Sequence, residues 1–67
     1  MSGIDKVFRR YGEDVFGKAY MNKITDEQVE EARVYACNEL ARRTAKYGKQ
    51  DSGTVKDLFC SYIFKHF

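Results

Sequence analysis

The sequence contains few side chains that can ligate a metal ion. The three best candidates are Cys37, Cys60 and His66. A structural zinc site needs four ligands, and the sequence has neither a Cys-x-x-Cys pair nor a fourth ligand close to these three. We therefore predict no metal site, and we interpret the two cysteines as small apolar residues.

Catalytic patterns are equally scarce. The acids Glu27, Glu30 and Glu31 lie close together, but the first turns of a helix are where carboxylates stabilise the helix dipole. The only histidine, His66, is the penultimate residue, and the sequence has no glycine-rich phosphate loop and no nucleophile elbow. We predict a protein that is not an enzyme and that uses no cofactor.

A group of basic residues has the chemistry to contact phosphates. It comprises Arg42, Arg43, Lys46, Lys49 and Lys56. Such cations, with an interleaved ring such as Tyr47, are typical of nucleic-acid binding, but they also suit a solvated face at the negative end of a helix dipole. The net charge is only +2 and the pI about 8.6. A helix-turn-helix over residues 41–58 is a weak match, because its loop exceeds the usual turn of about 3–4 residues.

Aromatic residues are concentrated near the C-terminus. Four rings fall within nine residues: Phe59, Tyr62, Phe64 and Phe67. A helix that is apolar nearly all round cannot be covered by two neighbouring helices alone, so part of it is expected to contact something else. We assign Phe59, Tyr62 and Ile63 to the core, and we predict that Cys60, Phe64 and Phe67 form a protein-binding patch.

Arg33 falls in the middle of the apolar arc of a predicted helix. Its stem can pack on the core while its guanidinium reaches a carboxylate such as Asp14 or Asp57. The second interpretation is that this face is partly open and meets an acidic or phosphate-bearing partner. We therefore include Arg33 among the candidate protein-binding residues.

Three helices are expected to position these side chains. Hydrophobic spacing predicts them at about 3–21, 26–47 and 54–66. The first contains two glycines but keeps its apolar stripe in phase, so we expect one continuous or kinked helix. That stripe comprises Ile4, Val7, Phe8, Tyr11, Val15 and Ala19, and one apolar row of the second helix comprises Val29, Ala36, Leu40, Thr44 and Tyr47.

The helix ends carry their own signals. Residue pairs with capping spacing mark the three starts, and a glycine marks the end of the second helix. These residues are Ser2 with Asp5, Thr25 with Gln28, Thr54 with Asp57, and Gly48. Ile24 is also placed to form a hydrophobic staple with Val29.

Length and composition set the fold class. A chain of 67 residues with 43% hydrophobic residues and no proline is predicted to form a single helical domain over residues 1–67, an all-α compact three-helix bundle. The apolar runs are no longer than four residues. Such runs are too short for a membrane span or a signal peptide, so we expect a cytoplasmic protein.

The function expected from these features is non-catalytic. We predict a small intracellular regulator or inhibitor that binds a larger protein through the aromatic patch, as small proteins encoded by phages and mobile elements do. Contact with a second copy of the chain is the simplest way to bury the patch, so a homodimer is expected. The alternative is a DNA- or RNA-binding regulator that uses the basic end of the second helix and the 48–53 loop.

Overall fold

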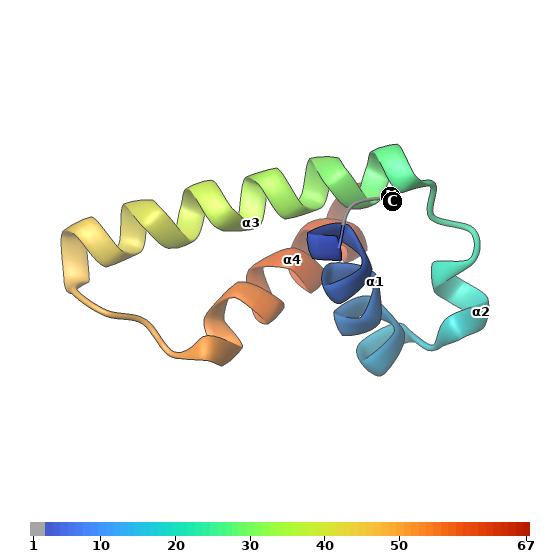
Figure 1. Ribbon diagram of the computed structural model, residues 1–67, viewed down its shortest axis with the longest axis horizontal. Helices are drawn as coiled ribbons and strands as arrows, with labels where there is room; N and C mark the ends of the chain where they lie inside the picture. The colour runs from blue at the N-terminus through green and yellow to red at the C-terminus, as the bar shows by residue number, and fades with distance from the viewer. Residues whose placement is uncertain (1–2) are drawn as a thin grey trace.

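The computed structural model describes residues 3–67, which form four helices and no strand. These are α1 (Gly3–Phe16), α2 (Lys18–Met21), α3 (Asp26–Tyr47) and α4 (Ser52–His66). In Figure 1 the long helix α3 runs across the top, α1 and α4 lie beneath it, and α2 forms a short turn at one side. The three longer helices make the bundle, which confirms the predicted all-α fold. The proposed cap residue Ser2 lies outside the described residues.

The first predicted helix, expected to be continuous or kinked over residues 3–21, is instead interrupted at Gly17 and forms two helices, α1 and α2. Gly17 has a φ of 90°, a value that other residues rarely adopt. The chain turns there and brings Met21 back onto α1. A Cβ at residue 12 would lie 2.6 Å from the Met21 sulfur. Met21 can therefore pack this closely only because Gly12 has no side chain.

The start of α3 follows the sequence prediction closely. The Gln28 amide donates to Thr25 Oγ1 at 3.1 Å, and the Thr25 amide donates to Gln28 Oε1 at 2.9 Å, which completes a capping box. Ile24 and Val29, the two residues of the expected hydrophobic staple, are both buried. The local sequence therefore fixes where α3 begins.

The start of α4 differs from the prediction. The helix begins at Ser52, two residues early, with Asp51 in the capping position. The amide of Thr54 donates to the Asp51 carbonyl at 3.0 Å, so Thr54 is already inside the first turn and the predicted Thr54 cap is wrong. At the other end of this loop, Gly48 closes α3 with a φ of 91°. The connection is consequently shorter than expected.

The hydrophobic core lies between the first half of α3 and the other helices. Phe59 is fully buried, and its ring meets that of Phe8 edge to face at 5.2 Å between centroids. Along α3 the buried positions end at Ala36, and every residue from 41 to 49 is exposed. The core residues are Phe8, Met21, Ile24, Val29, Ala32, Ala36, Leu58, Phe59, Cys60 and Ile63.

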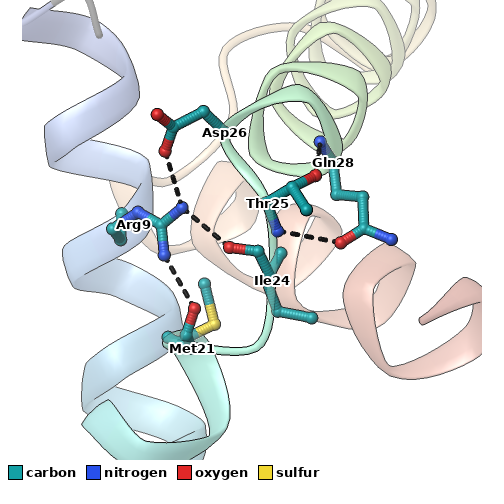
Figure 2. A network of polar contacts seen from close by, with 6 residues as sticks. All are labelled: Arg9, Met21, Ile24, Thr25, Asp26 and Gln28. Atoms are coloured by element: carbon teal, nitrogen blue, oxygen red, sulfur yellow. Dashed lines mark hydrogen bonds and ion pairs between the residues drawn. The ribbon is translucent and has the colours of Figure 1, made fainter.

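Arg9 ties α1 to the turn that leads into α3 (Figure 2). Its guanidinium donates to the Met21 carbonyl at 2.7 Å, to the Ile24 carbonyl at 2.9 Å and to the Asp26 carboxylate at 2.9 Å. The sequence places Arg9 opposite the apolar stripe of its helix, where a solvated cation is expected. Instead it satisfies two backbone acceptors of the turn and clamps three elements together.

We predict that Arg9→Ala lowers the free energy of unfolding by about 2 kcal/mol, because two carbonyls and a carboxylate lose their shared donor. Urea unfolding followed by circular dichroism measures this change. The neighbouring exposed residue gives a matched control, and Arg10→Ala should change stability by less than about 0.5 kcal/mol. Equal effects of the two substitutions would contradict the role of Arg9.

Candidate functional site

The predicted patch of Cys60, Phe64 and Phe67 does not form one surface. Cys60 is buried, with 7% of its surface exposed, so its assignment to a contact patch is wrong. Its thiol lies 3.8 Å from the Tyr11 carbonyl, and burial raises the pKa of the thiol. Phe67 is 37% exposed, and its ring packs edge to face on Tyr62. Phe64 alone projects freely, with 77% exposed.

Phe64 lies on α4 one turn beyond Cys60, the residue whose thiol contacts α1. These helices pack antiparallel, because Asp14 lies 3.8 Å from Lys56 and the Tyr11 carbonyl accepts from Cys60. One further turn along each helix leads to Val7 on α1 and to Phe64 on α4, and both residues are exposed.

Further apolar residues extend this surface along α1. Ile4 and Val7 belong to the stripe that the sequence predicts to face the core, yet they are 59% and 49% exposed. Val15, on the same stripe, is also exposed, and only Phe8 of that stripe is fully buried. We define Ile4, Val7 and Phe64 as the α1/α4 apolar face.

Arg33 has a structural partner on α1. Its Nε donates to Asp5 Oδ1 at 2.7 Å, and both side chains are largely buried. The carboxylate that pairs with Arg33 is thus Asp5, and the expectation of Asp14 or Asp57 is wrong. Because the guanidinium joins α3 to α1, the structural interpretation of Arg33 accounts for its place in the apolar arc.

The basic residues of α3 surround a shallow depression of about 380 Å³. Arg42 and Arg43 both pair with Glu39, and the hydrogen bond from Arg42 lowers the pKa of that carboxyl. The Lys46 ammonium lies 5.2 Å from the centroid of the Tyr47 ring. The lining residues are Glu39, Arg42, Arg43, Lys46, Tyr47 and Gln50.

The two remaining members of the predicted basic group do not line this depression. Lys49 is exposed in the loop that follows α3. Lys56 faces α1 instead, where its ammonium lies 3.8 Å from Asp14 and 5.9 Å from the centroid of the Tyr11 ring. Lys56 therefore lies apart from the basic depression.

A stack of aromatic rings crosses from α3 to α4, and sequence reasoning missed it. The Tyr35 and Tyr62 ring centroids are 4.8 Å apart, and those of Tyr62 and His66 are 4.3 Å apart. The Tyr62 hydroxyl donates to Glu31 Oε2 at 2.6 Å, which raises the pKa of the phenol. A depression of about 190 Å³ lies here, lined by Tyr35, Ser61, Tyr62, Lys65 and His66.

Neither a metal centre nor a membrane span is found in the described chain. Across residues 3–67, no three His, Cys, Asp or Glu side chains come together in a way that would hold a metal ion. None of the described helices combines the length and the apolar character needed to cross a membrane.

Comparison with known proteins gives no further guide. No protein-family model, no curated protein and no solved structure matches the chain.

Arg33→Ala should lower the free energy of unfolding by about 1–2 kcal/mol, because the largely buried Asp5 carboxylate loses a charge-assisted hydrogen bond. Chemical denaturation gives the value directly. Arg42→Ala, which removes an exposed ion pair instead, should cost less than about 0.5 kcal/mol. Unchanged stability of Arg33→Ala would favour the second interpretation, in which this arginine meets a partner.

Proposed function

We propose that this protein is a small non-catalytic regulator or inhibitor that docks on another protein through the α1/α4 apolar face. The observation that carries the proposal is the exposure of Phe64, which is 77% accessible, together with that of Ile4 and Val7, which are 59% and 49% accessible. Full burial of a side chain of this kind contributes about 1.5–3 kcal/mol. A binding partner would supply that burial.

The composition of the face supports an interface. Aromatic residues are enriched at the centres of protein–protein interfaces, and charged residues are depleted there. All three residues are about half exposed or more, and exposed apolar patches mark protein-interaction sites. A standard interface buries about 800 Å² on each partner. The face would therefore form the apolar centre, with polar residues around it as the rim.

Two kinds of protein partner suit this face. We favour a larger protein that the chain regulates or inhibits, and a second copy is the simplest alternative cover, giving a homodimer. Self-association would raise the apparent stability of so small a domain by mass action. The exposed free thiol of Cys37 suits a reducing compartment, so we place this activity in the cytoplasm.

We expect Phe64→Ser to abolish association while it leaves the helical circular dichroism signal unchanged, because the ring contributes little to packing within the monomer. Light scattering over a range of protein concentrations detects a second copy. A pull-down from the native host, analysed by mass spectrometry, detects a larger protein.

Tyr47→Ser is the matched control for this experiment, because Tyr47 is a similarly exposed ring, 70% accessible, at the far end of α3. It should retain association. If Phe64→Ser lost its helical signal, Phe64 would belong to the core. If Phe64→Ser associated as the unmodified protein does, or if the unmodified protein bound neither a copy nor a host protein, the α1/α4 apolar face would not be an interface.

A further inference from the structure

The aromatic depression and the basic depression lie along the same side of α3. Tyr35, Glu39, Arg42 and Lys46 follow one another at intervals of four, three and four residues, which places them on one stripe of a helix. Tyr35 lines the aromatic depression, whereas the other three line the basic one. Tyr35 and Lys46 are eleven residues apart, which corresponds to about 16 Å along the helix axis.

The positive charge of the protein is concentrated at one end of this stripe. The stretch from Glu39 to Gln50 contains four cations and one carboxylate, a net charge of +3, whereas the whole chain has a net charge of +2. In Figure 1 this end of α3 and the following loop extend away from α1 and α2. The cations are therefore placed where a long anionic ligand can reach them.

The two arginines at this end are held in position by an ion pair that occupies only some of their N–H donors. Arg42 and Arg43 share the single carboxylate of Glu39. Each guanidinium has five N–H donors, so one carboxylate leaves several donors free on both. Glu39 thereby orients two phosphate-binding groups at the edge of the depression.

Flat aromatic rings flank these cations on both sides. Tyr35 begins the stack of Tyr35, Tyr62 and His66 at one end, and the largely exposed Tyr47 lies at the other. Nucleobases stack on such rings with little dependence on sequence, and a basic groove follows the phosphates. An acidic protein surface would also account for the cations, but the order of ring, cations and ring along α3 matches the bases and phosphates of a single strand.

We propose that this side of α3 and α4 binds single-stranded nucleic acid. Arg42, Arg43 and Lys46 contact the phosphates, and bases stack on Tyr35 and Tyr47. A duplex does not fit this arrangement, because bases stacked within it cannot reach the rings. The site is separate from the α1/α4 apolar face, so it goes beyond the function proposed above and does not depend on it.

The test is fluorescence anisotropy of the full chain with labelled 12-nucleotide oligo(dT) and oligo(rU). About three phosphate contacts predict that the affinity falls about 20-fold between 50 and 200 mM salt. The double substitution Arg42→Ala with Lys46→Ala should flatten this dependence and weaken binding at least tenfold. Its control, Lys6→Ala with Lys18→Ala, removes the same charge from exposed positions on α1 and α2 and should change affinity less than twofold.

Substitutions of the two tyrosines test whether bases stack on their rings. Tyr47→Ser should weaken binding about tenfold, and because its ring is exposed the fold is expected to survive. Tyr35→Ala should act in the same way, and Tyr35→Phe should restore binding because the ring is retained. Phe64→Ser should leave the affinity for oligonucleotides unchanged, which separates this site from the α1/α4 apolar face.

Three results would overturn the proposal. The first is no binding of either oligonucleotide at 50 mM salt. The second is equal affinity for a 12-base-pair duplex. The third is oligonucleotide binding that is unchanged by Tyr47→Ser and Tyr35→Ala, together with equal affinity for polyglutamate of similar length. The site would then recognise negative charge alone, as on an acidic protein.

Discussion

The dominant constraint on this protein is that α3 is much longer than the core against which it packs. Its 22 residues correspond to about 33 Å, but its buried positions end at Ala36. A chain of this size has too few other helices to cover both halves of such a helix. The second half is therefore largely exposed, and it carries three cations, Arg42, Arg43 and Lys46, against one carboxylate, Glu39. The free basic end is a consequence of the limited core.

The same shortage of covering elements leaves a second surface open. α1 is buried at Phe8 and Gly12, whereas its apolar residues Ile4, Val7 and Val15 are exposed. The molecule thus presents two chemically different sides. The α1/α4 apolar face suits a protein partner, whereas the α3/α4 side combines rings with cations. A single helix, α4, contributes to both, through Phe64 on one side and Tyr62 on the other.

Charged residues also hold the fold together, over long distances in sequence. Arg9 reaches Asp26, 17 residues away, and Arg33 reaches Asp5, 28 residues away. Both guanidiniums are largely shielded from water, where hydrogen bonds to carboxylates and carbonyls are stronger than at the surface. These two arginines join α1 to both the entry and the middle of α3. Among the described residues, the ion pairs of Arg42 and Arg43 are with Glu39 on their own helix. These pairs do not join the far end of α3 to another helix.

The sequence by itself determined the features that depend on neighbours along the chain. The all-α fold, the bounds of α3 and the Thr25–Gln28 capping box follow from local spacing and local hydrogen bonds. The close approach of Met21 to Gly12, the burial of Cys60 and the ring stack of Tyr35 with Tyr62 do not. Each depends on how two helices are rotated and shifted against each other. That register is decided by the packing of the whole core, so only the tertiary structure determines which of several plausible stripes is buried.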